Sequence, residues 1–190
     1  PQASRFYALG SALALAFLVA GLIASFSHLG RPERAWRSAA KWRTSWLSRE
    51  VIVLPAFMGT VFLYGAAHFA GFNPVLATLP SGVPVNVTAI LGVAGTVLAF
   101  ALFVCTGMIY ACLRFLQEWH TPLTVINYTL LGGASGFVLA TALAALVAPE
   151  MTRFTAGWAM ILTLLALIGR AASLLRNARL KPKSTLCTAI

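Results

Sequence analysis

Charge is scarce in this chain. Only 9% of its 190 residues are charged, and it has four acidic residues compared with 14 Lys and Arg. A soluble domain carries roughly 25% charged residues, so the composition argues against a soluble class. The rest of the composition agrees, because 59% of the residues are apolar and the mean hydropathy is +0.85.

Cysteine and the familiar catalytic motifs are also rare or missing. The three cysteines predict no disulfide framework: Cys105 and Cys112 lie two turns apart on one predicted helix and cannot bridge each other, and Cys187 lies in a basic tail. No phosphate loop, CxxC pair, HExxH helix or nucleophile elbow is present. These absences argue against the enzyme classes that depend on such motifs.

Long apolar runs are what the chain does contain. A helix of about 20 apolar residues crosses a hydrocarbon core of ~30 Å, whereas a membrane β-barrel needs short strands of alternating polarity. Five continuously apolar runs fit the helical case: 6–27, 51–72, 88–113, 125–148 and 155–175. Gly132 and Gly136, one turn apart, favour close helix packing in lipid. The sequence therefore predicts an all-α, polytopic transmembrane bundle with one domain over 1–190.

The ends of the chain lead to two further expectations. The first run follows Arg5 but exceeds the length of a signal-peptide core and lacks a small-residue cleavage site before residue 28, so it is predicted to be a retained helix. The chain begins at Pro1 without Met and stops at Ile190 just after a basic stretch. We expect both ends to be cuts through a longer protein.

The basic residues predict an orientation. If the runs alternate across the membrane, one side receives twelve of the 14 cations and the other only Arg5 and Arg153. Short loops rich in Lys and Arg stay cytoplasmic, so the 28–50 loop and the basic 176–190 tail are predicted to be cytoplasmic. These charges lie next to lipid, where headgroups and a partner compete for them, and we expect no nucleic-acid binding.

The polar segment 28–50 interrupts the apolar pattern most strongly. Arg34, Arg37 and Lys41 recur on one face of a helical stretch, which predicts a short helix in the membrane interface with its cations toward water. Ser48 is predicted to cap the next spanning helix, with Glu50 favoured by the positive end of its dipole.

His28 and Glu50 are the best candidates for chemistry in this segment. Both lie at ends of predicted membrane helices, and a carboxylate at that position tends to mark a proton or substrate path. Histidine can pass a proton or donate a hydrogen bond to a carbonyl oxygen. Quinol oxidation requires such groups beside an apolar slot, although a purely structural role for the pair stays open.

A second set of polar residues lies near the predicted cytoplasmic end of the third run. Tyr110, Arg114 and Glu118 are spaced to share one helical face on the same side as Glu50. They could border a quinone site, or they could be an interfacial Tyr with a snorkelling Arg paired to Glu.

The histidines argue against a bound haem. His28 precedes the second run and His68 lies near its far end. At a rise of 1.5 Å per residue, this places the two histidines near opposite faces of the membrane. His120 lies in a loop. We expect no haem and no metal in this chain, and His68 is predicted to be an interfacial residue.

Two segments resemble a known family. The run His28-Leu-Gly-Arg-Pro-Glu-Arg-Ala-Trp, followed by Ser45-Trp-Leu-Ser-Arg-Glu50, resembles the signature loop of the DMSO reductase anchor subunit (DmsC) family. The closing stretch 179–190 is also similar to members of that family. The resemblance implies about eight helices in a full-length protein of the bacterial cytoplasmic membrane.

The same resemblance implies a function. Such an anchor is a non-catalytic subunit without a redox cofactor of its own, and it exchanges electrons between quinone (menaquinone or ubiquinone) and a four-cluster iron–sulfur subunit, which serves a molybdopterin catalytic subunit. The family's quinol-linked histidine and glutamate match His28 and Glu50, and Arg49 also matches. The loop cations are expected to receive an acidic face of the iron–sulfur partner: Arg31, Arg34, Arg37, Lys41 and Arg43.

Several alternatives stay open at this point. The basic, Trp-rich loop resembles anchors of cytoplasmic sulfite-oxidising enzymes as well as those of DMSO reductases, and the predicted cytoplasmic position favours the former. A small secondary transporter would show helices interrupted near the midplane in matched positions; Pro55 and Gly59 could mark one interruption. A purely structural anchor is the remaining possibility.

Overall fold

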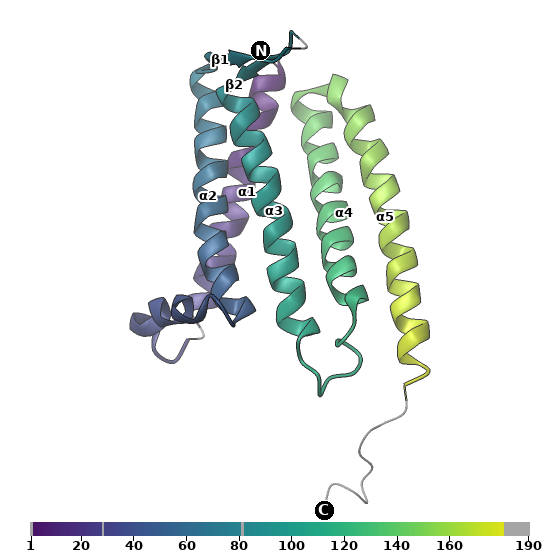
Figure 1. Cartoon of the computed structure of the whole chain (residues 1–190). Coiled ribbons are helices and arrows are strands. Elements are labelled where there is room, and N and C mark those ends of the chain that lie inside the picture. The colour runs from purple at the N-terminus through teal and green to yellow at the C-terminus, as the bar shows by residue number, and fades with distance from the viewer. Residues whose placement is uncertain (1, 28, 81, 181–190) are drawn as a thin grey trace, which may run out of the picture.

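Five long helices make up most of the structure. The computed structural model describes residues 2–27, 29–80 and 82–180. Within these residues, five helices are long and apolar enough to cross a membrane, and they run side by side (Figure 1). They are α1 (Gln2–Ser27), α2 (Trp46–Ala70), α3 (Val87–Ala111), α4 (Pro122–Val147) and α5 (Pro149–Asn177). The predicted all-α transmembrane bundle is confirmed.

Local sequence explains where several of these helices begin and end. Thr121 accepts a hydrogen bond from the Leu123 amide at 3.4 Å, and Pro122 occupies the first turn of α4, where its missing N–H costs nothing. Gly71 ends α2 in the left-handed conformation, with φ of 67°. Ala148 lies between α4 and α5, so α5 starts at Pro149 rather than near 155 as predicted.

A short β-hairpin connects α2 and α3, and the apolar pattern did not predict it. Strands β1 (Val75–Thr78) and β2 (Pro84–Asn86) pair antiparallel. The hairpin lies across the same end of the bundle as the N-terminal end of α1 (Figure 1). Asn73 ties it to α3, because its Oδ1 accepts hydrogen bonds from the amide and the hydroxyl of Thr88 at 3.2 and 2.8 Å.

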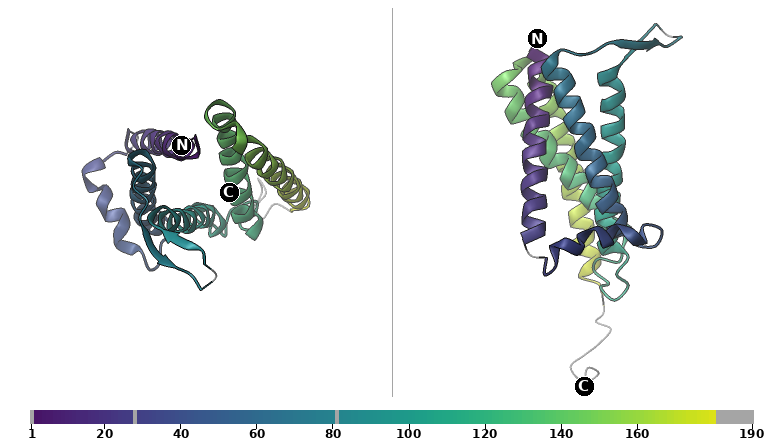
Figure 2. Two further views of the ribbon diagram at one scale, coloured as in Figure 1. Left: turned by 90° about the horizontal axis from the view of Figure 1, so that it is seen from above. Right: turned by 90° about the vertical axis from the view of Figure 1, so that its left-hand side faces the viewer.

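The first four helices are arranged in a ring. Seen along the bundle, α1, α2, α3 and α4 follow one another around this ring and α5 packs outside on α4 (Figure 2). Contact between α1 and α4 is made near the hairpin end, where Phe6 packs against Ala144 and Ala148 in a buried cluster. Toward the other end, the α1 side chains Ile23 and Phe26 are exposed.

The polar segment folds into a short helix, η1 (Pro32–Lys41), lying crosswise at the opposite end of the bundle (Figures 1 and 2). It is a 3₁₀ helix rather than an α-helix, and with three residues per turn Arg34 and Arg37 share a face while Lys41 falls a third of a turn away. The short helix is therefore present, but the predicted common face of three cations is wrong.

The start of α2 differs from the prediction. Ser45 is the N-cap, not Ser48, and its side chain accepts from the Ser48 amide at 3.4 Å. Ser48 is instead buried inside the helix, where its hydroxyl donates to the Ser38 carbonyl of η1. Glu50 then lies beyond the first turn, where the helix dipole has little effect, so the predicted dipole stabilisation is wrong. The end of the predicted 28–50 loop is part of α2.

The predicted helical face after the third run does not form. Helix α3 ends at Ala111, and 112–121 is a loop of turns, so Tyr110 and Arg114 do not stack one turn apart on a helix. Arg114 and Glu118 make no ion pair among the described residues. Cys105 and Cys112 are free thiols, as predicted, and Cys187 lies outside the described residues.

Glycine allows close packing at some positions and not at others. A Cβ on Gly132 would overlap the Phe103 ring of α3, whereas one on Gly136 would meet nothing within 4 Å. Only the first of the two predicted packing glycines therefore has a close neighbour. Helix α2 continues through Pro55 and Gly59, and none of the spanning helices in the described ranges is broken near its middle.

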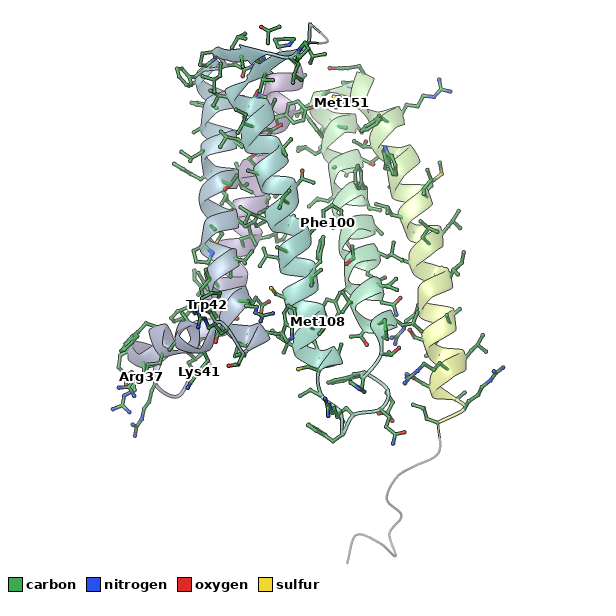
Figure 3. All side chains as sticks on the ribbon, in the orientation of Figure 1. Arg37, Lys41, Trp42, Phe100, Met108 and Met151 are labelled. Atoms are coloured by element: carbon green, nitrogen blue, oxygen red, sulfur yellow. The ribbon has the colours of Figure 1, made fainter. Side chains whose placement is uncertain are left out.

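The basic residues gather at one end of the bundle, which we call the polar end. It carries η1, the 112–121 loop and the C-terminal end of α5 (Figure 1), and the side chains of Arg37 and Lys41 project from it (Figure 3). Arg5 and Arg153 lie near the N-terminal ends of α1 and α5 at the opposite end. Which side of the membrane the polar end faces stays a prediction.

Candidate functional site

A cavity of about 1050 Å³ opens toward the polar end of the bundle. All five helices and the 112–121 loop contribute to its walls. Its lining is Leu18, Glu50, Leu54, Leu102, Phe103, Thr106, Tyr110, Glu118, Trp119, Thr124, Asn127, Tyr128, Leu131, Gly132, Ser135, Arg170, Ser173 and Asn177. Small-molecule sites are concave and combine apolar walls with convergent polar groups, and this lining contains both kinds of side chain.

Glu50 is the carboxylate of α2 in this cavity. It is partly buried, and its Oε1 accepts a hydrogen bond from the Thr106 hydroxyl of α3 at 2.6 Å. No Lys or Arg in the described ranges forms an ion pair with it. A charge at the edge of the hydrocarbon region is costly without a partner. The hydrogen bond from Thr106 offsets part of that cost.

Aromatic rings form another part of the wall. Tyr110 of α3 stacks on Tyr128 of α4, with ring centroids 5.7 Å apart and planes 12° from parallel. Trp119 meets Tyr110 edge-on at 5.2 Å. Flat aromatic faces stack readily on other planar rings, so this part of the cavity suits a planar ligand.

The α4 and α5 side of the cavity carries buried polar groups. Asn127 is 8% exposed and Ser173 is 7% exposed. The Asn127 Nδ2 donates to Ser173 Oγ at 2.7 Å, and the Ser173 hydroxyl donates to the Gly169 carbonyl at 3.1 Å. Interhelical hydrogen bonds of this kind hold membrane helices together.

Arg49 lies beside Glu50 in the chain but makes its contacts elsewhere. Its guanidinium donates to the carbonyls of Trp42 and Arg43 at 3.0 and 2.9 Å and covers the Trp46 ring at 4.2 Å. It is absent from the cavity lining. In this position Arg49 stabilises the turn between η1 and α2.

The other predicted site cations also lie outside the cavity. Arg114 is exposed in the 112–121 loop and does not line it, whereas Tyr110 does. The five predicted docking cations are all exposed at the polar end: Arg31, Arg34, Arg37, Lys41 and Arg43. Two of them cover tryptophan rings, Arg37 over Trp36 at 5.6 Å and Arg43 over Trp42 at 5.5 Å.

The three histidines do not come together at the cavity. His28 lies outside the described residues. His68 is in the last turn of α2, at the hairpin end, where its Nδ1 lies 3.4 Å from the Ser4 hydroxyl. His120 pairs with the Ala111 carbonyl at 2.6 Å. No group of three potential metal ligands occurs in the part of the chain that the structure describes.

Sequence reasoning missed several residues of the cavity. Thr106, Asn127, Tyr128 and Ser173 all lie inside runs that were treated as uniformly apolar. The available signal was their polarity, because a hydroxyl or amide in a membrane helix needs a partner. Which of them face one another follows only from the helix packing.

The structure defines a multi-pass helical membrane protein. Its helices are long enough to span a membrane and are unbroken, and a cavity opens at the polar end. The family model of the DMSO reductase anchor subunit (DmsC) matches residues 2–188. The chain therefore belongs to this family, and the resemblance noted in the sequence is confirmed.

One relative is similar over the whole chain. The chain is 60% identical over 189 residues to a protein of Allochromatium vinosum (strain ATCC 17899 / DSM 180 / NBRC 103801 / NCIMB 10441 / D) that is named as a subunit of sulfite dehydrogenase. The match covers 100% of this chain and 58% of that relative's length. No solved structure matches the chain.

Proposed function

We propose that this chain is the quinone-reactive part of a membrane anchor subunit, and that it passes electrons between the quinone pool and an iron–sulfur subunit of a molybdopterin oxidoreductase. Family membership supports the anchor role. The observation that carries the quinone site is Glu50, hydrogen-bonded by Thr106 at 2.6 Å in a cavity of about 1050 Å³. This site places a proton-accepting group beside an apolar space large enough for a ring and part of a tail.

The chemistry of a quinone fits these parts. Reduction of a quinone takes up two electrons and two protons, and oxidation of the quinol returns them. The electrons pass to or from the clusters of the iron–sulfur partner. Glu50 takes or gives the proton of one ring oxygen, and Glu118, exposed in the same lining, leads that proton toward water. The proton of the other ring oxygen exchanges with water that enters the cavity.

The substrate of the whole complex is proposed from the relative. That protein is named as a subunit of sulfite dehydrogenase, which supports a complex in which sulfite and water yield sulfate, two protons and two electrons at the catalytic subunit. Those electrons then reduce the quinone bound to this chain. We place the complex in the bacterial cytoplasmic membrane with its polar end facing the cytoplasm, as the charge distribution favours.

A titration with a fluorescent quinoline N-oxide tests the site. Glu50→Gln in the complete complex is expected to raise the dissociation constant of this quinol analogue about tenfold or more, equivalent to ~1.4 kcal/mol. His28→Ala, the other half of the family signature, is expected to act in the same direction. Glu150→Gln is the matched control, because Glu150 is exposed at the start of α5 at the opposite end. Tight binding in both site variants would favour a purely structural anchor.

The same complex allows a separate test of docking. The exposed cations of the polar end are proposed to bind an acidic face of the iron–sulfur subunit, an interaction that salt screens within about 8–10 Å. Arg37→Glu should release this subunit from membranes at lower salt than the wild type. Arg153→Glu carries the same charge change at the hairpin end and should not. Equal retention in all three proteins would contradict the docking surface.

A further inference from the structure

The Asn127 amide is held in a fixed direction on the α4 side of the cavity. Its Nδ2 lies 2.7 Å from Ser173 Oγ. The single hydroxyl proton of Ser173 is already directed at the Gly169 carbonyl at 3.1 Å, so Ser173 accepts from Asn127 rather than donating to it. The amide nitrogen therefore points toward Ser173, and the amide oxygen lies toward Gly169, where an added Cβ would come within 2.6 Å of it.

This buried amide has more hydrogen-bonding capacity than the protein uses. A side-chain amide offers two N–H donors and an oxygen with two lone pairs. One N–H is taken by Ser173, and the buried Oδ1 has no partner among the described residues. Asn127 is 8% exposed and lines the cavity. The Oδ1 faces Gly169 of α5, so the group left for a ligand is the second N–H. The interhelical contact explains one N–H, and the other needs a further explanation.

The position of Asn127 relative to Glu50 suggests that explanation. Glu50 belongs to α2 and Asn127 to α4, and α3 packs between these helices. Both line the same cavity, so they approach a ligand from different walls. The stacked pair of Tyr110 and Tyr128 lines the cavity beside them. A quinone ring carries its two oxygens on opposite sides, which matches polar groups on separate walls.

We propose that Asn127 is the second headgroup contact of this cavity: its free N–H donates to the quinone oxygen opposite the one that Glu50 serves. The inference rests on the proposed quinone function. A side-chain amide does not ionise near neutral pH, so Asn127 binds the ring in both redox states. Glu50 handles the proton of its own ring oxygen, and the proton of the oxygen at Asn127 exchanges with water in the cavity. An N–H donor suits both states, because the oxygen of a quinol hydroxyl also accepts. Ser173 positions the Asn127 amide.

The experiment uses the complete complex in membranes. The probes are a quinoline N-oxide, titrated by fluorescence quenching, and quinone turnover. Asn127→Leu, similar in size but without donors, is expected to raise the dissociation constant and the KM for quinone about tenfold, with a smaller change in kcat. Ser173→Ala, which loosens the amide, should raise both a few-fold. Thr129→Val is the control on the same helix, because the Thr129 hydroxyl bonds only to its own helix at Val125.

Thermal stability separates a binding role from a packing role. If Asn127→Leu and Ser173→Ala lower the Tm equally and leave the dissociation constant and KM unchanged, while Glu50→Gln still weakens binding, Asn127 is only an interhelical contact. That result overturns this inference and leaves the proposed function standing. If Glu50→Gln is also without effect, both fail. Asn127→Ala, which is smaller and also has no side-chain donor, serves if the leucine variant does not assemble, and the same loss of affinity is expected.

Discussion

The Thr106 hydroxyl of α3 donates a hydrogen bond of 2.6 Å to Glu50 Oε1 of α2. This contact joins two helices at the cavity and fixes the direction of a carboxylate within a membrane-spanning segment. A hydrogen bond to a charged group contributes about 1.5–3 kcal/mol, so Thr106 should influence both the stability and the chemistry of the site.

Thr106→Val tests this contact, because the substitution keeps the shape and removes the donor. We expect the quinone turnover of the complex to fall about tenfold, in line with a loss of ~1.5 kcal/mol, since Glu50 loses its fixed position. Thr106→Ser should restore most of the turnover. Thr96→Val is a suitable control on α3, because its hydroxyl bonds only to Gly92 of the same helix. Full activity of Thr106→Val would contradict a role for this bond.

Gly132 and Gly136 offer a matched pair on α4. Gly132→Ala would place a Cβ against the Phe103 ring with severe overlap, whereas Gly136→Ala meets nothing within 4 Å. Overpacking a close helix contact costs typically about 1–3 kcal/mol. The first variant should therefore lower the Tm of the purified protein by several degrees, and the second should leave it within error. The reverse order would show that α3 and α4 pack differently.

Arg49→Lys tests the turn between η1 and α2. A lysine cannot reproduce the two guanidinium bonds to the carbonyls of Trp42 and Arg43, at 3.0 and 2.9 Å. We expect faster tryptic cleavage after Arg43 in membranes, with binding of the quinoline N-oxide almost unchanged. Arg37→Lys serves as the control, because Arg37 is exposed and covers only the Trp36 ring. A large loss of inhibitor binding in Arg49→Lys would instead place Arg49 in the site.

The orientation can be tested with single cysteines in a variant that lacks the native three. Ala40→Cys lies in η1 at the polar end, and Ala77→Cys lies in β1 at the hairpin end; both positions are exposed. In intact cells, a membrane-impermeant maleimide should label Ala77→Cys and spare Ala40→Cys, because the polar end is predicted to be cytoplasmic. After the cells are opened, both should react. Labelling of Ala40→Cys in intact cells would reverse the orientation.

Some errors in the sequence-based predictions have simple local causes. Ser45 and Ser48 both precede or open an apolar run, and either could cap a helix; the buried bond from Ser48 to the Ser38 carbonyl depends on η1 folding back onto α2. Similarly, the spacing of Tyr110 and Arg114 fits a helix, but α3 ends at Ala111. In the first case the position of η1 decided between conformations that the local sequence allowed. In the second, the chain turns after Ala111, whose carbonyl pairs with His120 of the following loop.

The sequence by itself determined the class, the number of spanning helices, the concentration of cations in one segment and the family, because hydropathy and motif spacing are properties of the linear chain. Only the tertiary structure decided that Glu50 pairs with Thr106, that Arg49 turns away from the cavity, and that Asn127 and Ser173 meet across α4 and α5. Two of these contacts join residues that are dozens of positions apart in the chain, and the third depends on the direction in which one side chain points. They are set by how the helices rotate and pack against one another, which no local pattern records.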